Sequence, residues 1–174
     1  AFEKFLGRTF RGELGQFFTP RTIVEFMVSV LDPQEGELVC DPCCGSGGFL
    51  IRSFEYVREQ IESELKQRKE EIKAQLIPDN YDDLKTKEKE DIDTRISDVF
   101  AKMNYEVDLS NEKGRLRSLS FNCIYGTDAN PRMARTAKMN MIMHGDGHGG
   151  VHHHDGLLNV NGIWDGRFDV ILTN

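Results

Sequence analysis

The chain has 174 residues, of which 39% are hydrophobic and 29% are charged, and its formal net charge is −7. This composition is that of a globular protein long enough for one domain with its own core, and no apolar run is long enough to span a membrane. The acidic balance argues against a free-standing chain that grips nucleic acid through a basic surface, so any phosphate contacts must come mainly from elsewhere.

The first third of the chain predicts a helix, a strand, a tight loop and a second helix. Residues 21–31 have apolar side chains at helical spacing, and Pro20 stands directly before them. A turn at residues 32–36 separates this helix from a short apolar strand at residues 38–41. A glycine-containing loop follows, and residues 49–55 then have the pattern of a helix.

The composition changes between residues 57 and 113, where Glu and Lys dominate and glycine is absent. Two sparse apolar stripes, separated by a break at Pro78, predict two solvent-facing helices inserted before the second strand. The stripes are Val57, Ile61, Leu65, Ile72 and Leu76, then Ile92, Ile96, Val99, Phe100 and Met103. One interpretation of this charged section is a surface that contacts a partner or DNA. We favour the other, a pair of helices with solvated faces, because runs of charge usually face solvent.

The second half alternates strands with a helix. Strands are predicted at residues 121–126, 151–153 and 168–173. A helix follows the first of these, with Asn130 as its N-cap, Pro131 at its first position and Gly145 after its end. Alternating strands and helices predict an α/β fold with a Rossmann-like, doubly wound parallel sheet, whose ligands bind at the carboxyl ends of the strands.

The stretch at residues 41–49 has the chemistry of a ligand-binding loop. Its glycines let backbone N–H groups approach a ligand, and the following helix N-terminus adds positive partial charge. The spacing is not G-x-G-x-x-G, which disfavours a nicotinamide oxidoreductase. Asp41, at the end of the strand, suits a cationic or hydroxyl-bearing ligand. The alternative, that an Asp before a Pro only forms a turn, is less favoured.

Two motifs in this chain resemble those of one enzyme family. The sequence Asp-Pro-Cys-Cys-Gly-Ser-Gly-Gly-Phe at residues 41–49 resembles the cofactor loop of S-adenosylmethionine-dependent DNA adenine-N6 methyltransferases. The sequence Gly-Gln-Phe-Phe-Thr-Pro-Arg at residues 15–21 resembles their upstream companion motif. Together they are similar to the modification subunit of type I restriction–modification systems, over most of the chain except the charged section. The resemblance implies the N-terminal part of a class I methyltransferase domain, spanning residues 1–174 with the 57–113 insertion.

The resemblance also implies a set of residues that bind S-adenosylmethionine. Asp41 would face the cofactor's ammonium, Asp128 its ribose hydroxyls and Asp155 its adenine amino group. The alternative for Asp128 is a helix cap, for which Asn130 is better placed; for Phe17 and Phe18, packing is as favoured as ligand contact. The complete set is Gln16, Phe17, Phe18, Thr19, Pro20, Arg21, Asp41, Pro42, Gly45, Ser46, Gly47, Gly48, Phe49, Asp128, Ala129, Asp155, Gly156 and Leu157.

Asn174, the last residue, follows an apolar strand, as does the Asn of the Asn-Pro-Pro-aromatic motif in the resembled family. Its implied role is catalytic: it would hold the amino group of a flipped-out adenine toward the cofactor's methyl group. A chain rarely stops directly after a buried strand, so we expect a fragment that is inactive alone. The resemblance implies double-stranded DNA as substrate and specificity and restriction subunits as partners. The cysteines, which lack disulfide-framework spacing, favour a reducing, cytoplasmic location. A single-chain restriction–methylase fusion and a non-catalytic cofactor-binding or assembly module remain alternatives.

The sequence also contains clusters of potential metal ligands. His152, His153 and His154 are adjacent, and three cysteines lie at residues 40–44. Successive strand residues point to opposite faces, so the three histidines cannot converge on one ion, and no C-x-x-C pair supports zinc. We therefore predict no metal site. The cysteines lack disulfide-framework spacing and are expected to be free thiols.

Overall fold

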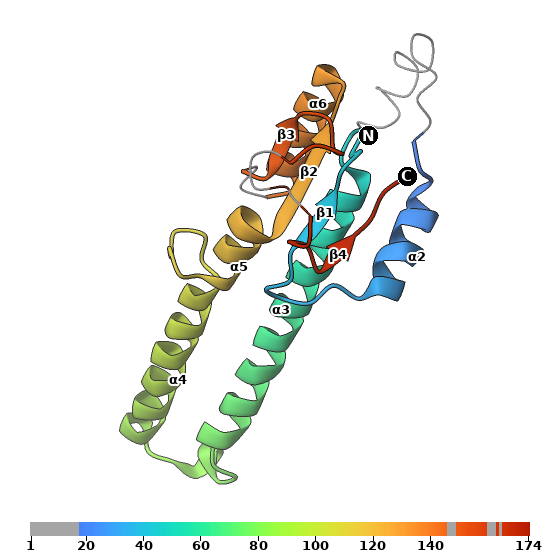
Figure 1. Cartoon of the computed structure of the whole chain (residues 1–174). Helices are drawn as coiled ribbons and strands as arrows, with labels where there is room; N and C mark the ends of the chain where they lie inside the picture. The colour runs from blue at the N-terminus through green and yellow to red at the C-terminus, as the bar shows by residue number, and fades with distance from the viewer. Residues whose placement is uncertain (1–17, 146–148, 160–162, 164) are drawn as a thin grey trace.

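The computed structural model describes residues 18–145, 149–159, 163 and 165–174. Its strands β1 (Val39–Asp41), β2 (Ile124–Asp128), β3 (Val151–His153) and β4 (Val170–Ile171) form one sheet in the order β3-β2-β1-β4. Every pairing in this sheet is parallel (Figure 1). The predicted α/β class with a parallel sheet is confirmed.

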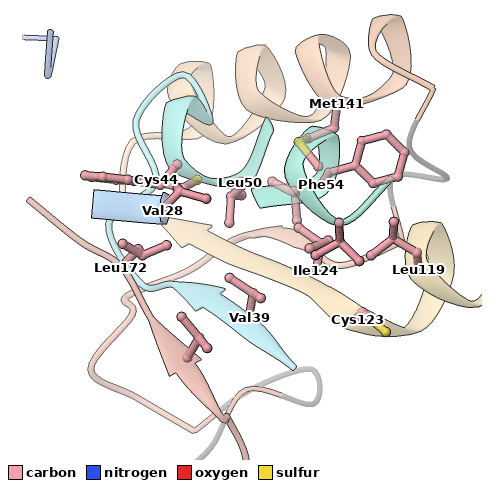
Figure 2. Close-up of a cluster of buried hydrophobic side chains, with 14 of the residues drawn as sticks. Val28, Val39, Cys44, Leu50, Phe54, Leu119, Cys123, Ile124, Met141 and Leu172 are labelled. Atoms are coloured by element: carbon pink, nitrogen blue, oxygen red, sulfur yellow. The ribbon is translucent and has the colours of Figure 1, made fainter. Parts of the chain in front are cut away.

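One face of the sheet carries the hydrophobic core. Val39 of β1 is aligned with Ile124 of β2 and Val170 of β4, and all three side chains belong to one buried cluster. Figure 2 shows this cluster, where Val39 and Ile124 lie beside Leu50 and Phe54 of the helix that follows β1. The next row along the strands faces the other side, because side chains alternate across a sheet.

Three helices cover the core face: α2 (Arg21–Leu31), α3 (Gly48–Leu76) and α6 (Pro131–Met143). The chain steps from β1 to β2 to β3 in one direction, and right-handed crossovers then place α3 and α6 on the same face. The return from β3 to β4 runs the opposite way and contacts the second face, where Phe168 packs on Tyr125 with ring centroids 5.5 Å apart. A doubly wound sheet would also have helices on that second face, and in the described residues they are not seen there.

The charged section is helical but divided differently from the prediction. The helix after the glycine loop does not stop near residue 57; α3 runs without interruption from Gly48 to Leu76. The predicted break at Pro78 is confirmed, and α4 (Thr86–Glu106) follows a short 3₁₀ turn at Tyr81–Asp83. Buried residues of α3 end at Leu65, and Met103 is the buried residue of α4, so most of this hairpin faces solvent. No helix in the described part of the chain has both the length and the hydropathy needed to cross a bilayer.

The boundaries of two strands were predicted wrongly. The strand expected at residues 121–126 begins only at Ile124, because the short helix α5 (Arg115–Ser118) continues as a helical turn over Leu119–Cys123. Leu119 and Cys123 are buried one helical turn apart, which the apolar pattern alone does not distinguish from a strand. The strand expected at residues 168–173 is reduced to Val170–Ile171. The helices at residues 21–31 and 131–143 are confirmed, and Asn130 caps the latter by accepting the Arg132 N–H at 2.9 Å.

The uneven burial along α3 gives a testable difference in stability. Ile61 is 1% exposed, whereas Ile72 on the same helix is only partly buried. We expect Ile61→Ala to lower the free energy of unfolding by about 2–5 kcal/mol through lost burial and a cavity. The matched change Ile72→Ala should cost less than about 1 kcal/mol. Urea unfolding of both variants measures the difference, and equal losses would contradict a solvated distal hairpin.

Candidate functional site

The candidate site lies at the carboxyl edge of the sheet, around the end of β1. The strand order reverses at β1, since β2 and β3 lie on one side of it and β4 on the other. In open α/β sheets such a reversal leaves a crevice outside the carboxyl ends of the strands, where ligands bind. The loops that follow β1, β2, β3 and β4 therefore supply the side chains of the site.

The loop after β1 has a backbone that requires glycine. Gly45 has φ +53° and Gly47 has φ +89°, both in the left-handed region. A Cβ at Gly47 would also lie 3.3 Å from the Cβ of Ala137 on α6. Gly47 is the N-cap of α3 and gives it no side-chain cap, so the first N–H groups of α3 remain available at this edge.

Hydrogen bonds fix this loop to the end of β2. The Thr127 hydroxyl donates to the Pro42 carbonyl at 2.7 Å, and the Cys44 N–H donates to the Thr127 carbonyl at 2.8 Å. The Gly45 N–H donates to Asp128 Oδ2 at 2.9 Å. The position of the loop is thus set by residues more than 80 positions away in the chain.

Asp41 is a buried carboxylate, with 2% of its surface exposed. The Cys43 N–H donates to Asp41 Oδ1 at 3.0 Å, and the Thr173 side chain lies near the carboxylate. Burial raises the pKa of Asp41 to about 6; the Cys43 N–H and Thr173 hydroxyl oppose this rise, and the nearby charge of Asp128 adds to it. At neutral pH Asp41 is therefore a poorly solvated anion, which favours a cationic group beside it.

Asp128 has a structural role that the sequence did not predict. Besides the Gly45 N–H at Oδ2, it accepts the Asn130 N–H at Oδ1, at 2.7 Å. Asn130, rather than Asp128, is the N-cap of α6, as expected. Each carboxylate oxygen can accept a second hydrogen bond, so bracing the loop does not exhaust the capacity of Asp128 to bind a ligand.

The segment after β3 lies against the same loop. A Cβ at Gly156 would lie 1.9 Å from the Pro42 carbonyl oxygen, so only glycine fits there without moving the backbone. Asp155 is exposed and accepts the Leu157 N–H at 3.0 Å, while Leu157 itself is 87% exposed. Ala129 is exposed too, and its carbonyl accepts a bond from His153 Nε2 at 3.1 Å.

The sequence offers the histidines and cysteines of this region as potential metal ligands or reactive thiols. Within the described ranges, no three His, Cys, Asp or Glu side chains group as metal ligands do. The four cysteines are free; Cys43 is exposed and the others are buried. Burial raises the pKa of Cys40 to about 12, and burial followed by the charge of Asp41 raises that of Cys43, so both thiols stay protonated at neutral pH.

The upstream motif meets the end of the chain at this edge. Gln16 and Phe17 lie outside the described residues; Phe18, Pro20 and Arg21 are exposed around the start of α2. The Asn174 side-chain N–H₂ donates to the Thr19 hydroxyl oxygen at 2.9 Å. Figure 1 shows the C-terminus beside the beginning of α2. No local pattern in the sequence predicts this contact, because the two residues are 155 positions apart.

Comparisons with known proteins agree on one family. A family model described as N-6 DNA Methylase matches residues 1–174. The chain is 48% identical over 48 residues to the methylase subunit of the type I restriction enzyme EcoEI of Escherichia coli, covering 28% of this chain and 10% of that protein. It is 38% identical over 53 residues to the type II methyltransferase M.VspI of Vibrio sp. strain 343, covering 30% of this chain and 13% of that protein.

A solved structure extends this similarity to nearly the whole chain. It is the crystal structure of a modification subunit assigned to a type I restriction enzyme from Vibrio vulnificus YJ016. The TM-score is 0.54 at 27% sequence identity, and the match covers 99% of this chain but 26% of that one. The chain thus spans about a quarter of this solved relative, and its matches to the two curated proteins span 10% and 13% of them.

The bracing role of Asp128 predicts a loss of stability on truncation. Asp128→Ala leaves two backbone N–H groups without their acceptor, so we expect the free energy of unfolding to fall by about 1–3 kcal/mol. Amide hydrogen exchange at Gly45 should become faster in the same variant. Asp155→Ala is the matched control, because Asp155 is exposed and holds one N–H; its cost should be below about 1 kcal/mol. If Asp128→Ala costs no more than this control, Asp128 does not brace the loop.

Proposed function

Because the chain belongs to the N-6 DNA methylase family, we propose that it transfers a methyl group from S-adenosylmethionine to the N6 amino group of adenine in DNA. The observation that carries this proposal is the convergence of Asp41, Asp128 and Asn174 on one edge of the sheet. Two buried or braced carboxylates stand on the loop side of that edge, and an asparagine amide stands on the β4 side. This is the layout that a cationic cofactor and an amine substrate require.

The residues at this edge fit S-adenosylmethionine. Buried Asp41 would accept the ammonium of the methionine end, and the N–H groups at the start of α3 would bind its carboxylate. Asp128 would accept the ribose hydroxyls with its remaining lone pairs, and Asp155 with Leu157 would hold the adenine. Ser46 and Gly48 would line the methionine part, with Phe18 to Arg21 closing over it. The strand order matches the first four strands of the doubly wound order 3-2-1-4-5-6, which supports a Rossmann-like class I domain.

The role of Asn174 in the chemistry is to position the amine. Bound S-adenosylmethionine supplies an electrophilic methyl group. The Oδ1 atom of Asn174 accepts a hydrogen bond from the N6 amino group of an adenine swung out of the duplex, and so aims the nitrogen lone pair. As the nitrogen would bond the methyl carbon, the carbon–sulfur bond of the sulfonium would break and its electrons would stay on the departing thioether. The nitrogen would become positive in this step, and the amide oxygen would stabilise that charge most in the transition state. The proton then leaves to solvent, so no strong general base is needed.

We assign residues 1–174 to part of such a methyltransferase domain, with residues 57–113 as a charged helical insertion. The chain carries a net charge of −7, which is unsuited to holding DNA phosphates by itself.

Separate subunits of a type I system, one that reads the DNA sequence and one that cuts, are therefore proposed as partners in the cytoplasm. The similarity to a type II methyltransferase favours a second candidate, a methylase that needs no separate specificity subunit. Activity measured with and without the specificity partner distinguishes the two.

The buried carboxylate predicts a pH dependence of cofactor binding. The ammonium pairs with ionised Asp41, whose pKa of about 6 means that protonation competes with binding as the pH falls. We expect the affinity for S-adenosylmethionine to weaken by about tenfold between pH 7 and pH 5, a range in which an α-ammonium stays charged. Calorimetric titration measures it. Asp41→Asn should bind weakly at both pH values, and Asp98→Asn, an exposed change on α4, should keep the wild-type profile. An unchanged profile in Asp41→Asn would remove Asp41 from the site.

Substitution of Asn174 tests the proposed methyl transfer directly. A methyl group cannot accept a hydrogen bond, so Asn174→Ala in the intact protein should retain cofactor and DNA binding but lose methyl transfer by at least about 100-fold. Incorporation of tritiated methyl into unmodified DNA, with the specificity partner present, measures the transfer. Asn122→Ala, at an exposed asparagine before the opposite end of β2, is the matched control. If wild-type protein methylates nothing with its partners present, the chain is a binding or assembly module instead.

A further inference from the structure

Asn174 is held by a specific partner at the edge of the site. Its Nδ2 atom donates to Thr19 Oγ1 at 2.9 Å. Thr19 is partly buried and stands just before the start of α2, while Asn174 is exposed after β4. No feature of the upstream motif predicts this contact, since its resemblance implies only closure over the cofactor.

The chemistry of an amide makes the choice of partner important. The two ends of an asparagine side chain are nearly equal in shape, but one donates hydrogen bonds and the other accepts them. An amine to be methylated needs the accepting end. With Nδ2 donating to the Thr19 hydroxyl, Oδ1 is the end that this arrangement leaves to face a substrate.

The neighbouring residue is fixed as well. The Thr173 side chain lies near the Asp41 carboxylate at the end of β1 and opposes the rise that burial causes in the pKa of that carboxyl. The Leu172 N–H donates to the Cys40 carbonyl at 3.0 Å, so the backbone before Thr173 is still tied to β1. The backbone that leads to Asn174 is therefore tied to β1 up to Leu172, which places the Asn174 side chain at this edge of the sheet.

From these contacts we propose that Thr19 is a positioning residue for the methyl transfer: its hydroxyl holds the amide of Asn174 so that Oδ1 faces the target amine. This inference rests on the proposed function and adds a role for the upstream motif beyond cofactor binding. It implies that the segment before α2 and the segment after β4 act together on the substrate nitrogen. Thr19 does not touch the reacting atoms itself.

The test compares variants of Thr19 in the intact protein with its specificity partner. Thr19→Val keeps the branched shape and removes the acceptor, and Thr19→Ser keeps the hydroxyl. At saturating S-adenosylmethionine and DNA we expect kcat to fall about tenfold in Thr19→Val and to stay within about twofold of wild type in Thr19→Ser. Both variants should still bind S-adenosylmethionine, which shows that the site is folded, and saturation with the cofactor removes any loss of affinity from the comparison of kcat. Thr22→Val, the same change at an exposed position one turn along, is the matched control.

The outcomes separate the two proposals. Unchanged kcat in Thr19→Val, with an active wild type, overturns the positioning role and leaves the methyltransferase function standing. A loss of cofactor affinity with kcat preserved at saturation makes Thr19 a cofactor contact and also overturns the positioning role. If kcat falls equally in Thr19→Val and Thr19→Ser, the loss does not come from the missing hydroxyl, and the positioning role is again overturned. Absence of methyl transfer by the wild type, or full transfer by Asn174→Ala, removes the proposed catalysis together with this inference.

Discussion

The hydrogen bonds between the loop after β1 and the end of β2 are the interaction on which the rest of the site depends. Pro42, Cys44 and Gly45 each bond to Thr127 or Asp128. These partners are brought together only by the parallel pairing of β1 with β2, since the charged helical hairpin separates them in sequence. A glycine loop is costly to order because its backbone has many conformations when free. The fixed end of β2 offsets that cost, so the shape of the loop is a property of the folded sheet.

The fold also buries the Asp41 carboxylate, where its ionised form is poorly solvated. The pKa of Asp41 is about 6 in the folded protein and close to 3.9 in an unfolded chain, so between these values the folded state binds the proton more tightly. The free energy of unfolding contributed by Asp41 therefore falls as pH rises from about 4 to 6, and the cost persists at neutral pH. An uncharged residue would avoid this cost. In the proposed function, the cationic cofactor beside the glycine loop would stabilise the ionised form of Asp41 and offset this cost.

The sequence predicted those parts of the molecule that depend on local pattern. The helix at residues 21–31, the capped helix from Pro131 and the strand at residues 151–153 were all predicted with their observed bounds or start. The start of β2 was missed because Leu119 and Cys123 meet the core from a helical turn, and short apolar runs suit either structure. The end of the first inserted helix was predicted well, but its beginning was not, because α3 continues through the composition change without a capping signal.

In the candidate site, too, some features follow from local sequence and others only from tertiary structure. The glycine loop and Asp41 are recognisable from spacing and residue type alone, since Asp41 ends a strand and the loop follows it directly. The bracing by Asp128 and the bond between Thr19 and Asn174 depend on tertiary structure, which no local pattern encodes. Gly156 is an intermediate case: a glycine after a strand is unremarkable in sequence, and its necessity appears only when the Pro42 carbonyl is seen to occupy the space of a Cβ.

The reversal of strand order at β1 explains why the proposed chemistry is shared among distant segments. On one side of β1, the loop and the end of β2 present carboxylates and backbone N–H groups, which suit a cationic, hydroxyl-bearing cofactor. On the other side, β4 delivers Thr173 to Asp41 and Asn174 to Thr19, so the amide stands next to the cofactor loop without belonging to it. In the proposed function, the two reactants that must meet in line would thereby be held by segments on opposite sides of β1. The pairing of β4 with β1 sets how these segments lie relative to each other, and that pairing is stabilised by the apolar row of Val39 and Val170 in the core.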